Sequence, residues 1–163
     1  MTDTPTFVIE RHFSAPPELV WRAWADPSLL SHWYGPGVTT VIHELDLREG
    51  GRWLTEMKMG ENSMFQRADF THVTDGERLV CSMSTTDAQW SIIANPMVPD
   101  WPRILQTEVT MRAADGGTDL RLVWTPQDAS EAELAFFAKT AEQSAGGWGK
   151  GFDVLETMLA DLS

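Results

Sequence analysis

The chain of 163 residues contains one cysteine, Cys81, and only 12 lysines and arginines against 24 aspartates and glutamates. A single cysteine excludes an internal disulfide and any metal site built from several thiolates, and it is typical of a reducing compartment. The formal net charge of −12 argues against nucleic acid and anionic membrane as partners, because both are bound through lysine and arginine.

Long apolar runs are also missing. No segment approaches the ~20 apolar residues that a membrane-spanning helix needs. Residues 1–5 have neither the basic nor the apolar region of a signal peptide, so we expect a cytoplasmic protein. A single domain over residues 1–163 is the expectation at this length, and 42% hydrophobic residues are enough to form its core.

Tryptophan, in contrast, is abundant, with eight residues against a single tyrosine, and apolar residues recur at two distinct spacings. Alternation with a period of two is typical of strands that are buried on one face. It predicts strands over residues 6–14, 38–47, 52–59, 64–74, 78–86, 103–112 and 118–125.

Helix signals occur at three places. One short helix begins near Pro16, and a second begins at Asp26, which is a suitable N-cap. Residues 130–162 carry apolar side chains at steps of three and four, which predicts one long helix with a capping box of Ser130 and Glu133. This order favours an α+β fold, in which a curved antiparallel sheet of about six to seven strands wraps around the long C-terminal helix. A hollow is expected between the sheet and the helix.

Several short stretches, taken in order, carry a family resemblance. They are Arg11-His12-Phe13-Ser14-Ala15-Pro16, Val20-Trp21-Arg22-Ala23-Trp24, Trp33-Tyr34-Gly35-Pro36, Asp46-Leu47-Arg48-Glu49-Gly50-Gly51 and Gly147-Trp148 with Leu155. Together they resemble the START/Bet v-like (SRPBCC) superfamily over essentially the whole chain. Within it they are most similar to the branch named after the activator of the heat-shock-protein-90 ATPase, also labelled polyketide cyclase-like. The resemblance implies a helix-grip fold that encloses a cavity, and superfamily members bind lipids, hormones and polyketides, while a few are cyclases.

Signals for metal binding and catalysis are weak. The four histidines lack the helical spacing of metal ligands, so we expect no metal and no other cofactor. Cys81 shares its strand face with apolar neighbours and is expected in the core, and we assign no catalytic residue. Arg11, Asp69 and Glu108 would face inward only if the strand register were shifted by one residue.

The strongest candidates for a ligand-binding site are the side chains on the face of the sheet toward the C-terminal helix. A Met- and Trp-rich segment, 87–102, could act as a lid over them. The candidate ligand-binding residues are Trp53, Met57, Gln66, Met83, Trp90, Met97, Trp101, Thr107, Trp124, Phe137, Trp148 and Phe152. Ordinary core packing is the alternative for each inward residue, and a crossing loop or a dimer contact is the alternative for the segment.

Three functions follow from these observations. The first is non-catalytic binding of a small hydrophobic or aromatic ligand in the cavity, by a monomer or a homodimer. The second is a cyclase- or hydrolase-type enzyme acting on a polyketide-like substrate. The third is a protein-interaction module related to a chaperone ATPase activator, in which the acidic surface would attract a basic partner.

Overall fold

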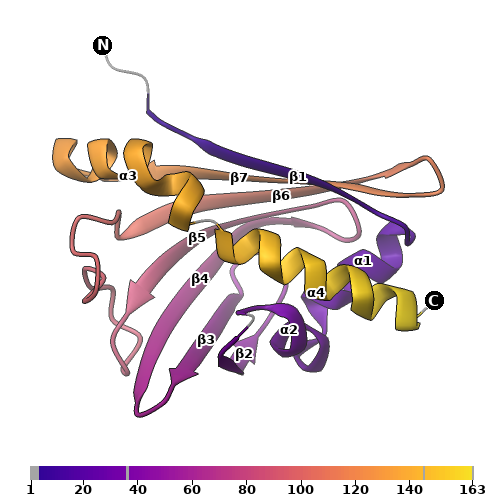
Figure 1. Cartoon of the computed structure of the whole chain (residues 1–163), viewed down its shortest axis with the longest axis horizontal. Coiled ribbons are helices and arrows are strands. Elements are labelled where there is room, and N and C mark those ends of the chain that lie inside the picture. The colour runs from indigo at the N-terminus through magenta and orange to yellow at the C-terminus, as the bar shows by residue number, and fades with distance from the viewer. Residues whose placement is uncertain (1–3, 36, 145, 163) are drawn as a thin grey trace.

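The computed structural model describes residues 4–35, 37–144 and 146–162. Seven strands form one curved antiparallel sheet in the order β1-β7-β6-β5-β4-β3-β2, and the C-terminal helical segment lies across its inner face (Figure 1). The strands are β1 (Phe7–Phe13), β2 (Thr39–Leu45), β3 (Arg52–Met59), β4 (Asn62–Thr74), β5 (Arg78–Thr86), β6 (Ile104–Ala114) and β7 (Gly117–Gln127). The helices are α1 (Pro17–Ala25), α2 (Pro27–Trp33), α3 (Glu131–Ser144) and α4 (Gly146–Leu162). The predicted α+β helix-grip fold is therefore confirmed.

The predicted C-terminal helical segment is confirmed. It comprises α3 and α4, and residue 145 between them lies outside the described residues. The capping box is also confirmed, because the Ser130 hydroxyl accepts from the Glu133 N–H at 3.1 Å and the Glu133 carboxylate accepts from the Ser130 N–H at 2.9 Å.

The two faces of the sheet follow from its register. Residues that pair across neighbouring strands share a face, and Trp53, Ala68, Met83 and Leu105 form one such row, with all four side chains buried. The inward faces predicted from parity are confirmed by this register. Cys81 belongs to the same inner face and is buried, as the sequence predicts.

The two short helices close one end of the sheet. The Asp26 carboxylate accepts from the Ser28 N–H at 3.0 Å, so the predicted N-cap of α2 is confirmed. The indole N–H of Trp33 donates to the Ala23 carbonyl at 3.0 Å, which ties the end of α2 back to α1. This contact holds the residues that follow α2 against the inner face. In the part of the chain that the structure describes, no helix is long and apolar enough to cross a membrane.

Candidate functional site

A pocket of about 290 Å³ lies between the inner face of the sheet, the end of α2 and the middle of α4. Its walls are mainly aromatic rings and methionines, with two glycines where the backbone comes close and one amide side chain. The lining residues are Trp33, Tyr34, Gly35, Val38, Met57, Gln66, Met83, Trp124, Trp148 and Gly151.

Trp148 is the centre of the aromatic cluster around this pocket. Its ring stacks on Trp24 with centroids 5.9 Å apart, and it meets Tyr34 at 5.4 Å and Trp124 at 6.1 Å in edge-to-face arrangements. The cluster therefore joins α1, α4, β7 and the loop after α2. Close approach of α4 to α2 requires Gly151, because a Cβ there would lie 3.1 Å from the Trp33 carbonyl oxygen.

One hydrogen bond crosses the pocket wall. The Tyr34 hydroxyl donates to the Gln66 side-chain carbonyl at 2.6 Å and lies 4.0 Å from the Met83 sulfur. Burial raises the pKa of the Tyr34 phenol, because the phenolate would lose its hydration inside the protein. Tyr34 is therefore a hydrogen-bond donor at neutral pH, and it fixes the orientation of the Gln66 amide.

Five of the predicted ligand-binding residues line the pocket together: Met57, Gln66, Met83, Trp124 and Trp148. Their common position follows from the register, since β3, β4, β5 and β7 each contribute one inward side chain, and these side chains form a diagonal across neighbouring rows of the inner face.

Two further predicted tryptophans border the pocket. Trp101 lines a smaller hollow of about 50 Å³ that shares Gln66, Met83 and Trp124 with it. Trp53 packs against the Tyr34 ring, with centroids 5.0 Å apart. The structure therefore places both residues beside the pocket rather than in its lining.

Three other candidates, Thr107, Phe137 and Phe152, are almost completely buried and do not line the pocket. Thr107 lies opposite Trp124 in the β6–β7 pair, and Phe152 packs behind Trp148 with ring centroids 5.9 Å apart. Their position in the structure is that of core residues that support the pocket walls.

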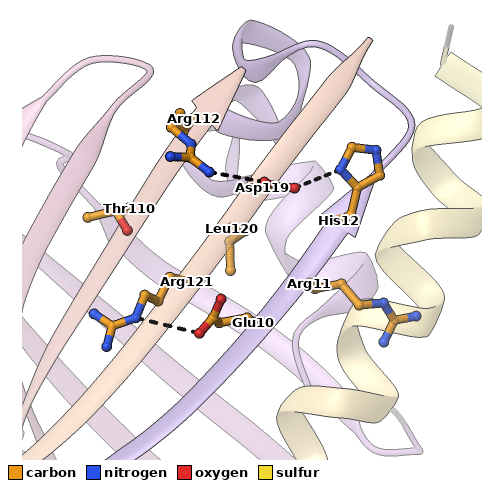
Figure 2. A pocket seen from close by; sticks show the side chains of 8 residues that line it. All are labelled: Glu10, Arg11, His12, Thr110, Arg112, Asp119, Leu120 and Arg121. Carbon is orange, nitrogen blue, oxygen red and sulfur yellow. Dashed lines mark hydrogen bonds and ion pairs between the residues drawn. The ribbon is translucent and has the colours of Figure 1, made fainter. Parts of the chain in front are cut away.

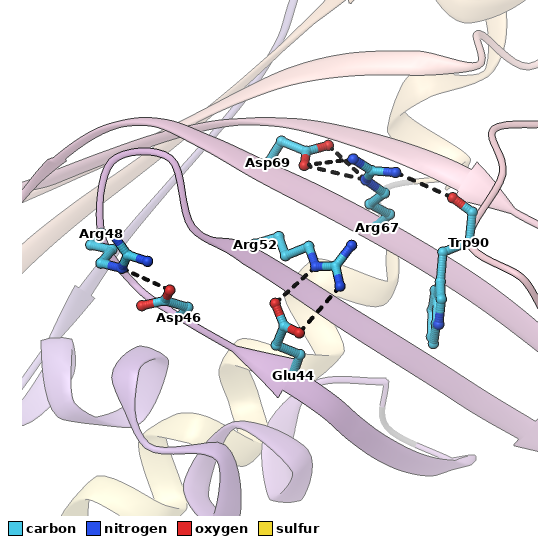
Figure 3. A network of polar contacts seen from close by, with 7 residues as sticks. All are labelled: Glu44, Asp46, Arg48, Arg52, Arg67, Asp69 and Trp90. Atoms are coloured by element: carbon cyan, nitrogen blue, oxygen red, sulfur yellow. Dashed lines mark hydrogen bonds and ion pairs between the residues drawn. The ribbon is translucent and has the colours of Figure 1, made fainter.

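The structure does not bring the other two proposed lid residues, Trp90 and Met97, to the pocket. Trp90 has φ +66 and packs on the outer face of the sheet, where its ring meets Phe65 at 5.5 Å and His43 at 5.4 Å. Its carbonyl accepts from Arg67 on the same face (Figure 3). The turn that Asp87 closes by accepting from the Ser91 N–H directs the chain to this side. Met97 is 73% exposed.

Sequence reasoning missed half of the lining, namely Trp33, Tyr34, Gly35, Val38 and Gly151. The first four follow one another at the end of α2 and in the next loop, where no strand parity applies. The sequence does contain a signal for this part of the lining. Two bulky aromatic residues stand directly before Gly35, which adopts φ +75, and such a glycine marks a place where the chain turns back.

The three charged residues that a shifted register would have turned inward do not line the pocket. Arg11 forms ion pairs with Asp153 and Glu156 at the edge of α4. Asp69 pairs with Arg67 on the outer face, as Figure 3 shows, at 3.0 Å. Glu108 pairs with Arg78 at 2.7 Å, also on the outer face.

The single cysteine and the candidate metal ligands are the remaining reactive groups. Burial raises the pKa of the Cys81 thiol to about 12, so the thiol stays protonated and unreactive at neutral pH. Among the described residues, no three histidine, cysteine, aspartate or glutamate side chains gather as ligands for a metal ion.

A second hollow lies on the outer face of β1, β7 and β6 and measures about 500 Å³ (Figure 2). Most of its side chains are charged, and several of them pair with one another. Asp119 accepts from His12 at 2.7 Å and lies 3.4 Å from Arg112, while Arg121 lies 3.9 Å from Glu10. The hydrogen bond from His12 lowers the pKa of the Asp119 carboxyl. The carboxylates of this hollow are therefore compensated by basic side chains of the same hollow.

An antiparallel sheet wrapped around a C-terminal helix, with two short helices after the first strand, defines a helix-grip domain. The chain belongs to the family described as "Activator of Hsp90 ATPase homolog 1-like protein", whose model matches residues 14–160. The resemblance seen in the sequence is therefore confirmed.

Solved structures with the same fold cover nearly the whole chain. Protein Ms6760 from Mycobacterium smegmatis is similar at 22% identity and a TM-score of 0.79, over 97% of this chain and 96% of that one. A protein from Arthrobacter aurescens is similar at 18% identity and a TM-score of 0.80, over 99% and 90%. Protein CV1439 from Chromobacterium violaceum is similar at 25% identity and a TM-score of 0.70, over 94% and 96%. No curated protein matches the chain.

Proposed function

We propose that this protein binds a small aromatic or hydrophobic ligand in the pocket between the sheet and α4, and that it does so without catalysis. The observation that carries the proposal is the composition of the pocket wall, in which Trp33, Tyr34, Trp124 and Trp148 surround the hollow and none of the described lining residues is charged. Walls of this kind favour apolar, flat molecules, because ring faces and methionines give contact area without a desolvation penalty for the ligand.

The volume of the pocket limits the size of the ligand. Sites for drug-sized molecules range from about 300 to 1,000 Å³, and a cavity of about 150 Å³ is enough for benzene. At about 290 Å³ the pocket fits a molecule of two fused rings rather than a long lipid. We therefore expect compact aromatic ligands to bind better than fatty acids or sterols.

The chemistry of the wall favours binding over a cyclase or hydrolase reaction. Among the described lining residues, Tyr34 is the one whose side chain titrates, and its raised pKa keeps the phenol protonated. A buried neutral phenol donates hydrogen bonds but does not act as a general base near neutral pH. The reducing, cytoplasmic location and the choice between monomer and homodimer stay predictions from the sequence.

A titration with naphthalene tests the proposal by calorimetry. Val38→Phe adds bulk at the pocket wall, in the loop before β2, and should weaken binding at least tenfold. Thr110→Phe makes a comparable addition in the outer hollow and should leave binding unchanged. Binding that is lost in Thr110→Phe but kept in Val38→Phe would place the ligand outside the pocket and contradict the proposal.

A further inference from the structure

The polar atoms of the pocket say more about the ligand than its apolar walls do. The carbonyl oxygen of Gln66 already accepts from the Tyr34 hydroxyl at 2.6 Å. Within the described residues, the amide N–H₂ group of Gln66 has no hydrogen-bond partner, although Gln66 lines the pocket. Because the carbonyl end of the amide faces Tyr34 in the structure, the free end is the N–H₂ donor.

A second unpaired donor belongs to another residue of the lining. Trp124 is only 7% exposed, and its indole N–H is buried without a hydrogen-bond partner among the described residues. The same is true of Trp24 and Trp53, but neither of these lines the main pocket. A buried, unpaired N–H destabilises a protein, so each such group calls for a partner. Trp124 and Gln66 both line the main pocket and the small hollow that Trp101 also lines.

We infer that the ligand is an uncharged aromatic molecule with a carbonyl oxygen, and that this oxygen accepts hydrogen bonds from the Gln66 amide and the Trp124 indole. The inference rests on the proposed function and specifies its ligand class. The rings lie against Trp148 and Trp33, and the carbonyl points toward the small hollow that Trp101 lines. Gln66 thus acts as a specificity-determining residue and Tyr34 as the residue that positions it.

A ligand with a carboxylate would also present an oxygen acceptor to the two donors, but its charge makes it unfavourable in this pocket. None of the described residues that line the main pocket is a cation, and burying an unpaired carboxylate is strongly unfavourable. Arg103 borders the small hollow, but its side chain is exposed and the protein carries a formal net charge of −12. A neutral carbonyl satisfies the two donors without this penalty.

Three matched probes test the inference: methyl naphthyl ketone, ethylnaphthalene and naphthoate, each titrated into the full chain by calorimetry. The ketone should bind about tenfold more tightly than ethylnaphthalene, and naphthoate should bind most weakly. Gln66→Met keeps the length of the side chain and should abolish the preference for the ketone, so that the ketone and ethylnaphthalene bind with equal affinity. Gln106→Leu removes an amide from the outer face and should change neither value.

The outcomes separate this inference from the proposed function. Equal affinities for the ketone and ethylnaphthalene in the unchanged protein would overturn the carbonyl contact and leave the binding function standing. If naphthoate bound more tightly than the ketone, the inference of an uncharged ligand would be wrong, and the carboxylate would be assigned to Arg103 as its partner. Absence of binding by all three probes would instead contradict the proposed function itself.

A second measurement needs no variant. The indole N–H proton of Trp124 should move downfield in the NMR spectrum when the ketone binds, because it gains a hydrogen bond. With ethylnaphthalene the same signal should show no downfield movement of this kind. Equal movement with both probes would mean that ring contacts, and not a hydrogen bond, cause the shift, and would overturn the assignment of Trp124.

Discussion

The two hollows on the sheet differ more in the chemistry of their walls than in their size. The outer hollow of about 500 Å³ is larger than the inner pocket of about 290 Å³, yet most of its wall is made of charged side chains at the surface, several of them in ion pairs. Those charges are solvated and already have partners, so a ligand would have to displace both water and an ion pair. The inner pocket offers ring faces and unpaired donors instead. The chemistry of the wall, rather than the volume, distinguishes the candidate site.

The two hollows lie on opposite faces of one sheet and share strand β7. Leu120 is 1% exposed and points to the core, whereas the side chain of its neighbour Arg121 is 54% exposed and points into the outer hollow. Figure 2 shows the same alternation on β1, where Arg11 turns toward α4 and Glu10 and His12 turn outward. The period of two along a strand therefore separates an aromatic interior from a charged exterior across one layer of backbone.

The largest expected difference between the two regions is in stability. Trp148→Ala removes the centre of the aromatic cluster and should lower the free energy of unfolding by about 3–5 kcal/mol. Arg121→Ala removes a surface side chain from the outer hollow and should change it by less than about 0.5 kcal/mol. Urea denaturation followed by circular dichroism measures both, and similar losses in the two variants would contradict the distinction.

A smaller effect should appear at high pH. Tyr34 is the sole tyrosine of the chain, so phenolate absorbance reports on it alone. Its folded pKa lies above the unfolded value of about 10. Its contribution to stability is therefore complete below pH of about 10 and is lost above it, by about 1.4 kcal/mol per pH unit until the folded pKa is reached.

The native protein should accordingly form no phenolate at a pH where the urea-unfolded chain is fully ionised. Tyr34→Phe should remove part of the alkaline loss of stability, while the part due to Cys81, with its pKa of about 12, remains. A native absorbance curve that coincides with the unfolded one would show that the phenol is not buried against Gln66.

The smallest expected effect contrasts two glycines of α4. A methyl group at Gly149 would meet open space, so Gly149→Ala should stabilise the protein by about 0.8–1 kcal/mol through helix propensity alone. A methyl group at Gly151 would lie 3.1 Å from the Trp33 carbonyl oxygen, on the pocket side, so the same gain should be absent there. Thermal unfolding of the two variants compares them directly, and equal gains would refute the close contact.

The sequence predicted the strands and their faces well, because alternation records which side of each residue is buried. That information placed Met57, Met83 and Trp124 around a common space. It could not place Trp33 and Tyr34, because their position depends on how α2 packs against α1 through the Trp33 indole. It also could not show that Trp90 crosses to the outer face, since a residue with φ +66 follows no strand or helix period.

The most direct test uses the eight tryptophans as reporters. In a two-dimensional NMR spectrum of the ¹⁵N-labelled protein, methyl naphthyl ketone should shift the indole signals of Trp33, Trp124 and Trp148, which line the inner pocket. The signal of Trp90, on the outer face beside Phe65, should stay in place. A shift confined to Trp90, with the three pocket signals unchanged, would contradict the account.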